Sequence, residues 1–147
     1  MMNERLSISK KIAHIGIAVR SIQEVLPFYT EVLGLQVVRQ ETMEKEGVLV
    51  AFLPIGECFL ELMEPLDKHS PVFNYIEKHG EGLHHVALEV EQLHQQIKIW
   101  ERSNVPLLNK YPRKGAWGKH VAFIHPVAAH GVLFEFCERQ ANRDGHV

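Results

Sequence analysis

The stretch GLHHVALEV, residues 82–90, decides the fold because it repeats an earlier part of the chain. When GLHHVALEVEQL is laid over KIAHIGIAVRSI, which starts at Lys11, His85 falls on His14. The offset is 85 − 14 = 71 residues. A constant offset over a block of apolar residues indicates an internal duplication, and such a repeat determines the architecture.

Two later blocks extend the duplication. The same offset of 71 carries VAFLP (50–54) onto residues 121–125 of the run VAFIHP (121–126), so that VAF falls on VAF. Beyond these blocks FLELME (59–64) resembles LFEFCE (133–138) at an offset of 74, so the second copy has a connection that is 74 − 71 = 3 residues longer. Four polar residues then hold matching places among apolar neighbours: His14, Glu61, His85 and Glu135.

The two adjacent histidines of the opening stretch have different expected roles. Neighbouring side chains of a β-strand point to opposite faces, so at most one of His84 and His85 looks into an interior site. The repeat selects His85 as the inward residue, because it is the equivalent of His14. His84 is expected to point elsewhere.

The first copy predicts the order strand, helix, strand, strand, strand. Its helix starts after Ser21, and Glu24 lies three residues on, as in a capping box. Gly34 suits the left-handed position that ends a helix, although Pro27 removes a backbone donor inside it. Apolar, β-branched runs predict the strands of this copy, which are residues 12–19, 35–42, 47–55 and 58–64.

The second copy repeats this order after a linking helix over residues 70–80, which Gly80 ends. Its own helix carries Leu93, Ile97 and Trp100 at helical spacing. The predicted strands of this copy are residues 83–90, 105–108, 119–126 and 131–138.

The sequence therefore predicts an α+β fold with a single domain over residues 1–147. Two βαβββ modules, about 11–66 and about 82–138, would form a curved eight-stranded mixed sheet around a cleft. A cleft lined by both modules is the expected place for the four matched polar residues.

Composition and charge narrow the class of protein. With 147 residues, 46% hydrophobic and 23% charged, the chain is ordinary for one globular domain. A net charge of −2 favours neither nucleic acid nor an anionic membrane as a partner. The polar N-terminus and the lack of about 18 consecutive apolar residues predict a soluble, cytoplasmic protein with no membrane partner. Cys58 and Cys137 are expected to be reduced core residues.

A shared cation explains why four polar residues would face one strand-built interior. Burying such groups unpaired costs several kcal/mol, and facing carboxylates repel each other. Two imidazoles and two carboxylates suit one divalent ion such as Co²⁺, Zn²⁺, Ni²⁺, Mn²⁺ or Fe²⁺. The remaining histidines are expected on the surface or in the core without metal: His69, His79, His94, His120, His125, His130 and His146.

The segment KYPRKGAWGKH, residues 110–120, is a basic loop between two predicted strands. A solvated loop explains it as well as an anion clamp over the cleft does. As a clamp it would offer Lys119 and His120 as substrate-binding residues for a carboxylate or a phosphate. Gly115 and Gly118 would let its backbone approach the ligand.

Several motifs together carry a resemblance to a known family. AHIGIAV, FYTEVLG, FLELMEPL, GLHHVALEV, GAWGKHVAFIHP and GVLFEF resemble the methylmalonyl-CoA epimerases of the vicinal oxygen chelate (glyoxalase) superfamily, from about Lys11 to Glu138. The resemblance implies interconversion of (2R)- and (2S)-methylmalonyl-CoA by α-proton transfer through a metal-stabilised enolate. It also implies an acyl-CoA substrate, one divalent metal ion per chain and a homodimer.

The resemblance assigns roles to the four matched residues. It implies that His14, His85 and Glu135 are metal ligands, that Glu61 takes a fourth ligand position, and that Glu135 is also a proton-transfer base.

Inversion needs a second acid/base group on the opposite side of the substrate. Where some epimerases have that glutamate, the alignment puts Val50. Glu44 or Glu46 would serve only with a shifted strand register and otherwise belongs to a solvated turn. Glu61 acting with Glu135 is the remaining possibility.

Two other functions stay open at the level of sequence. A glyoxalase I-type lactoylglutathione lyase resembles the chain in its two modules and in its metal ligands. A metal-free small-molecule-binding protein of the same fold resembles it in architecture, but such proteins have lost the ligand set.

Overall fold

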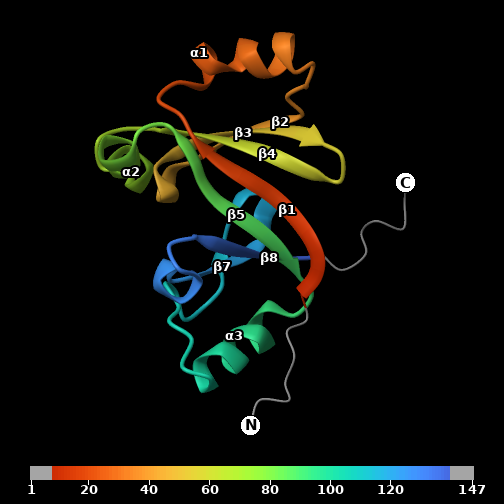
Figure 1. The fold of residues 1–147 in the computed structure, drawn as a ribbon, viewed down its shortest axis with the longest axis vertical. Coiled ribbons are helices and arrows are strands. Elements are labelled where there is room, and N and C mark those ends of the chain that lie inside the picture. The colour runs from red at the N-terminus through yellow and green to blue at the C-terminus, as the bar shows by residue number, and fades with distance from the viewer. Residues whose placement is uncertain (1–7, 140–147) are drawn as a thin grey trace. The chain divides into compact units, whose positions relative to one another are not determined.

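The computed structural model describes residues 8–139 of the chain. These residues fall into two compact units. The first unit comprises residues 14–85, and the second comprises residues 8–13 together with 86–139. Figure 1 follows the chain from β1 in red to β8 in blue.

The first unit contains a mixed sheet with the strand order β2-β3-β4-β1. β3 is antiparallel to both β2 and β4, whereas β4 is parallel to β1. Figure 1 shows β2, β3 and β4 side by side. The bounds of these strands are Ile8–Ala18 for β1, Arg39–Met43 for β2, Val48–Ile55 for β3 and Cys58–Pro65 for β4.

Two helices accompany the first sheet. α1 (Ile22–Pro27) has the predicted cap, since the Ser21 side chain accepts from Glu24 N at 3.2 Å. Pro27 ends the α-helix, and a π-helical turn, Phe28–Val32, follows it. α2 (Pro71–His79) is capped by Ser70 and ends before Gly80.

Strand alternation separates the main apolar cluster of the first unit from a second face that carries Glu61. Ala51 and Leu53 on β3 and Leu62 on β4 are completely buried and pack with Val19 and Ile22. Phe52 and Glu61, their neighbours in sequence, point to the opposite face because side chains alternate along a strand. Both faces of the sheet are buried at these positions, and the face that carries Phe52 also carries the buried carboxylate of Glu61.

The second unit repeats the pairing pattern of the first. Its strand order is β5-β8-β7-β6, with β5 parallel to β8 and the other pairs antiparallel. The elements are β5 (Gly82–Val90), α3 (Leu93–Arg102), β6 (Arg113–Lys114), β7 (His120–Ile124) and β8 (Phe134–Glu138). Short 3-10 turns follow β6 (Ala116–Gly118) and β7 (Pro126–Ala129).

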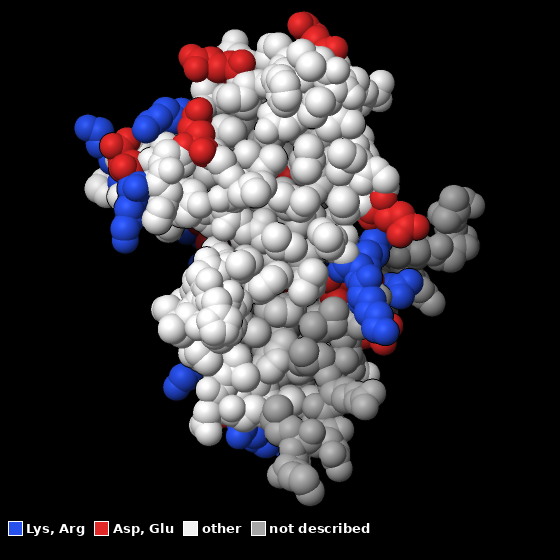
Figure 2. Space-filling view, viewed as in Figure 1, with Lys and Arg blue, Asp and Glu red and all other residues white. Residues whose placement is uncertain are grey.

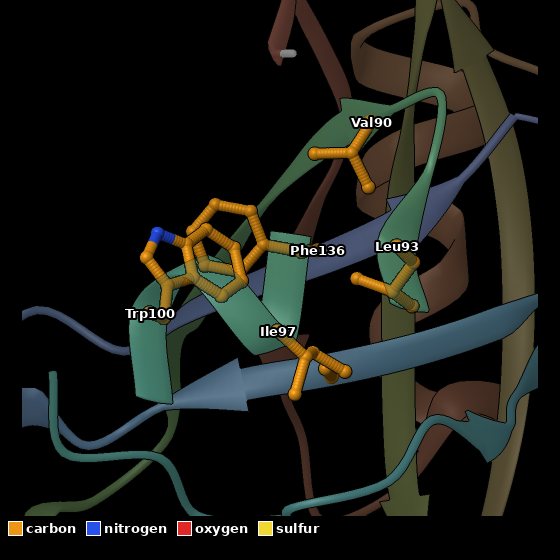
Figure 3. Packing of buried hydrophobic residues seen from close by; sticks show 6 residues of the cluster. Val90, Leu93, Ile97, Trp100 and Phe136 are labelled. Atoms are coloured by element: carbon orange, nitrogen blue, oxygen red, sulfur yellow. The ribbon is translucent and has the colours of Figure 1, made fainter. Parts of the chain in front are cut away.

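Helix α3 supplies the core of the second unit, as Figure 3 shows. Trp100 packs on Phe136 of β8 with ring centroids 4.6 Å apart. Ile97 and Leu93 lie about one and two turns before Trp100, and both are buried. Val90, at the end of β5, completes the labelled cluster.

The strand register confirms the duplication deduced from the sequence. Phe123 and Ala87 are the equivalents of Phe52 and Gly16 at the offset of 71. In each unit the glutamate strand runs between a small residue and a phenylalanine: Glu61 pairs with Gly16 and Phe52, and Glu135 pairs with Ala87 and Phe123. The chain thus has the predicted α+β class, with eight strands in a mixed sheet.

Two predicted strands differ from the structure. The strand expected over residues 35–42 starts only at Arg39. The strand expected over residues 105–108 is reduced to a single bridge between Leu107 and Ile124, because Pro106 cannot donate to a ladder. The fourth strand of the second sheet is β6 instead.

Charged groups of opposite sign lie side by side on the face drawn in Figure 2, over the region of α2. Arg20 Nη1 donates to Glu77 Oε1 at 3.0 Å, and Arg20 N donates to Glu81 at 2.7 Å.

Among residues 8–139, no helix combines the length and apolar character needed to cross a membrane. The predictions that rest on residues 1–7, and the one for His146, lie outside the described residues.

Replacing Leu93 with alanine is expected to lower the free energy of unfolding by about 2–5 kcal/mol, because it leaves a cavity beneath α3. Denaturant titration followed by tryptophan fluorescence measures this loss. The matched control is Leu108→Ala in the same unit, where the side chain is 52% exposed and a change within about 0.5 kcal/mol is expected. Equal losses for the two variants would contradict the placement of Leu93.

Candidate metal centre

Three polar side chains are buried together in the first unit. His14, Glu61 and His85 expose only 9%, 6% and 6% of their surfaces. Each would cost several kcal/mol if buried alone. One ligand atom from each lies within 4.8 Å of the others, so the three residues form a single cluster.

The strands place these side chains through their register. Gly16 lies two residues after His14 on β1, so both positions face the same side of the sheet. Glu61 of β4 pairs directly with Gly16. Because Gly16 has no side chain, it leaves a space beside Glu61.

The imidazole of His85 fills the space above Gly16. A Cβ built on Gly16 would overlap His85 Cε1 and Nδ1 and would come within 2.8 Å of Nε2. Any side chain at this position would therefore displace the His85 ring. Gly16 was not among the site residues predicted from the sequence. Its signal was its position two residues after a candidate ligand on the same strand.

The distances within the cluster are those of potential ligands to one ion. His14 Nε2 lies 3.0 Å from His85 Nε2 and 3.8 Å from Glu61 Oε2, and His85 Nε2 lies 3.6 Å from Glu61 Oε1. Atoms that each bind one ion at about 2.1 Å are at most about 4.2 Å apart. All three separations satisfy this limit.

Aromatic rings border the cluster. The His14 ring meets the edge of Phe52 with centroids 6.1 Å apart, and Phe52 meets Phe59 at 6.0 Å. Phe52 is 1% exposed. An apolar border restricts water and strengthens the interaction of charged groups with a bound cation.

The donor chemistry fits a divalent transition-metal ion. Imidazole nitrogens suit Zn²⁺, Ni²⁺ and Co²⁺, and a carboxylate adds negative charge that offsets part of the charge of the ion. His14, Glu61 and His85 supply such a set without rearrangement of their strands. The sequence predicted all three.

Glu135 occupies the equivalent position in the second unit. It is 8% exposed, and its Oε2 accepts a hydrogen bond from the buried thiol of Cys137 at 2.9 Å. The two residues are two apart on β8 and so share one face. Cys137 is buried as predicted, but its contact with the carboxylate was not anticipated.

A family model matches most of the chain. Residues 13–123 match the Glyoxalase/Bleomycin resistance protein/Dioxygenase superfamily. The chain belongs to this superfamily.

Relatives of this superfamily member include proteins with and without an assigned activity. The uncharacterized protein YqjC of Bacillus subtilis (strain 168) is 45% identical over 133 residues, which are 90% of this chain and 95% of YqjC. The mitochondrial methylmalonyl-CoA epimerase of Dictyostelium discoideum is 34% identical over 130 residues, covering 88% of this chain and 78% of that protein.

A solved structure gives the same indication. A Streptomyces coelicolor methylmalonyl-CoA epimerase variant in complex with 2-nitronate-propionyl-CoA has a TM-score of 0.85 and 33% sequence identity, covering 93% of this chain and 97% of that chain. The resemblance to the epimerases within the glyoxalase superfamily is thereby confirmed. The chain is an enzyme of the epimerase and racemase type.

His84 lies closer to the cluster of this superfamily member than strand alternation predicts. Its Nδ1 is 2.9 Å from Nδ1 of His85, and its side chain is half-buried. Alternation sets the direction of each Cβ, whereas a planar ring can turn back toward the strand. His84 does not belong to the group of candidate ligands, but it contacts one of them, His85.

Part of the segment predicted as an anion-binding loop, residues 110–120, forms a β-hairpin. Arg113 and Lys114 form β6, and Gly115 N donates to Lys119 O at 2.8 Å, which closes a hairpin. His120 begins β7 and is exposed, with its Nδ1 3.3 Å from Glu138 Oε2. Lys119 is half-buried.

The candidates for the second acid/base group are also placed. Position 50 of β3 is a valine and therefore offers no carboxylate. Its side chain is 1% exposed. Glu44 and Glu46 form a 3-10 turn before Gly47, with Glu44 exposed and Glu46 half-buried.

Replacing Gly16 with alanine is expected to weaken Co²⁺ binding by about 10- to 100-fold or more, because the new Cβ forces the His85 ring out of place. Competition with a chelator and the visible spectrum of the Co²⁺-loaded protein measure the loss. Gly115→Ala is the matched control, since its Cβ would crowd Val121 at 3.0 Å in the second unit. Unchanged affinity in Gly16→Ala would rule out His85 as a ligand held by this contact.

Proposed function

We propose that this enzyme is a metal-dependent epimerase that interconverts (2R)- and (2S)-methylmalonyl-CoA. The observation that carries the proposal is the buried cluster of His14, Glu61 and His85, whose ligand atoms lie within 4.8 Å of one another. Relatives named as methylmalonyl-CoA epimerases support the choice of substrate.

The three clustered residues would hold the metal ion, and Glu135 is proposed as the fourth ligand. Co²⁺, Zn²⁺, Ni²⁺ and Mn²⁺ are the candidates for this donor set. When bound, such an ion supplies Lewis acidity that stabilises negative charge on the substrate oxygens. The internal repeat supports this assignment, because Glu135 matches Glu61 in strand register and in burial.

Two carboxylates are proposed to move the α-proton. Inversion of a carbon centre requires removal of a proton from one face and its return on the other. Glu135 and Glu61 are the two buried carboxylates that the duplication relates. We therefore assign one to each face, with Glu44 and Glu46 as the alternative to Glu61.

The surroundings of both carboxylates favour proton transfer. Glu61 lies within 4 Å of two imidazoles, which restrict its orientation. The Cys137 thiol donates to Glu135 Oε2, which restricts the orientation of that carboxylate. Positioned groups of this kind contribute about 10²- to 10⁴-fold to a rate.

Lys119 and His120 are proposed to contact anionic groups of the acyl-CoA. They lie where the β6–β7 hairpin meets β7. The contact of His120 Nδ1 with Glu138 Oε2 at 3.3 Å restricts that imidazole at the strand end. The cytoplasmic location and the homodimer stay predictions of the sequence, which cell fractionation and sedimentation test.

Two other functions use the same fold. A lactoylglutathione lyase would need the same kind of ligands, so the relatives named as epimerases favour the first function over it. A metal-free binding protein would have no use for three buried donors directed at one point.

The metal-loaded protein is expected to exchange the α-hydrogen of methylmalonyl-CoA with solvent deuterium, and the chelated protein is expected not to. Proton NMR of the substrate in D₂O measures the exchange. Glu135→Gln should abolish most of it, since an amide carries no transferable proton at neutral pH. Turnover of the methylglyoxal–glutathione hemithioacetal without this exchange would transfer the assignment to the lyase.

Replacing Glu61 with glutamine is expected to preserve metal binding and to lower activity by about 10²- to 10⁴-fold, because the amide oxygen can ligate but cannot shuttle a proton. Metal content and the exchange rate are measured on the same preparation. Near-normal exchange would show that Glu61 is a ligand only.

A further inference from the structure

His84 has a contact that the proposed reaction does not use. Its Nδ1 lies 2.9 Å from Nδ1 of His85, well within hydrogen-bond distance. Two ring nitrogens at this distance attract only if one carries a proton and the other offers its lone pair. The contact therefore couples the tautomers of neighbouring imidazoles.

The other nitrogen of His85 determines which tautomer the cluster needs. His85 Nε2 is the atom that faces His14 Nε2 at 3.0 Å and Glu61 Oε1 at 3.6 Å. A cation can bind Nε2 only through its lone pair, so the ring proton must lie on Nδ1. Nδ1 is the atom that faces His84.

His84 is itself held in place by α2. The ring of Tyr75 meets the His84 ring with centroids 4.6 Å apart, and the Tyr75 hydroxyl donates to the carbonyl of Leu83 at 2.6 Å. The partly buried imidazole is thus fixed on one side by an aromatic ring and on the other by His85. An acceptor fixed in this way is ready before any ion arrives.

We propose that His84 is a positioning residue that accepts the Nδ1–H of His85 and so directs the Nε2 lone pair of His85 into the cluster. Gly16 leaves space for the His85 ring, and His84, by accepting the Nδ1–H, fixes the tautomer of that ring. The inference rests on the proposed function insofar as the cluster holds a metal ion. It concerns a residue that is not itself a ligand.

The same tautomers form a consistent chain of donors without any ion. With its proton on Nδ1, His85 donates to His84 and offers Nε2 to the Nε2–H of His14. Both short contacts are then satisfied at once. The reverse tautomer of His85 would instead require the proton of the second contact to come from His84.

Two substitutions of similar size separate the hydrogen bond from simple packing. His84→Asn keeps an acceptor, because the amide Oδ1 is attached to Cγ as Nδ1 is in histidine. His84→Leu has a similar branched shape without an acceptor. His79→Leu is the matched control, since His79 packs against the same Tyr75 with centroids 4.8 Å apart.

The first readout is the tautomer of His85 in the metal-free protein. The ¹⁵N chemical shifts of the ring, recorded at a pH that keeps imidazoles neutral, distinguish a protonated from an unprotonated nitrogen. The proton is expected on Nδ1 in the native protein, in His84→Asn and in His79→Leu. It is expected to move toward Nε2 in His84→Leu.

The second readout is the affinity for Co²⁺, measured against a chelator. His84→Leu is expected to bind about 10- to 100-fold more weakly than the native protein, as found when partners of metal-bound histidines are removed. His84→Asn and His79→Leu are expected to bind like the native protein. Circular dichroism confirms that each variant is folded.

The outcomes distinguish this inference from the proposed function. A proton on Nε2 of His85 in the native protein overturns the inference, even if His84→Leu fails to fold. Equal losses in His84→Asn and His84→Leu overturn it as well. If the native protein binds no Co²⁺ while the tautomer responds as expected, the proposed metal dependence fails and the role of His84 stands.

Discussion

The candidate site of this enzyme depends on a glycine, Gly16, which has no side chain. Gly16 stands on β1 beside Glu61, on the face of the sheet away from the core. The absence of a side chain there leaves room for the His85 imidazole, which a single Cβ would displace. The close approach of His85 to His14 and Glu61 follows from this steric condition. The proposed metal site depends on it in turn.

The duplication explains how one sheet pattern supplies both carboxylates. In each unit the glutamate sits on a strand that is parallel to the opening strand and antiparallel to the next one. Its neighbour on the opening strand is small, Gly16 in one unit and Ala87 in the other. Alternation along the same strands sends Leu62 and Phe136 into the two cores. Core and site are therefore built by the same strands, and a shift of register by one residue would exchange them.

Hydrogen bonds around the buried donors refine what the sheet positions. The Cys137 thiol restrains Glu135, and His84 faces the ring nitrogen of His85 that points away from the cluster. Buried polar groups need such partners, because each unsatisfied one costs free energy. Residues outside the ligand set can in this way control the chemistry of the residues within it.

The sequence by itself determined the repeat, the α+β class and the ligand candidates His14, Glu61 and His85, because equal offsets and strand alternation depend only on order along the chain. It also indicated a weak point at Pro27, where the α-helix ends, because proline lacks a backbone donor. The apolar pattern was misleading around Pro106, where the expected strand is reduced to a single bridge. Only the tertiary structure revealed the contacts of Gly16, His84 and Cys137. Those contacts depend on side-chain rotamers and on the approach of separate strands, which periodicity along a single chain does not encode.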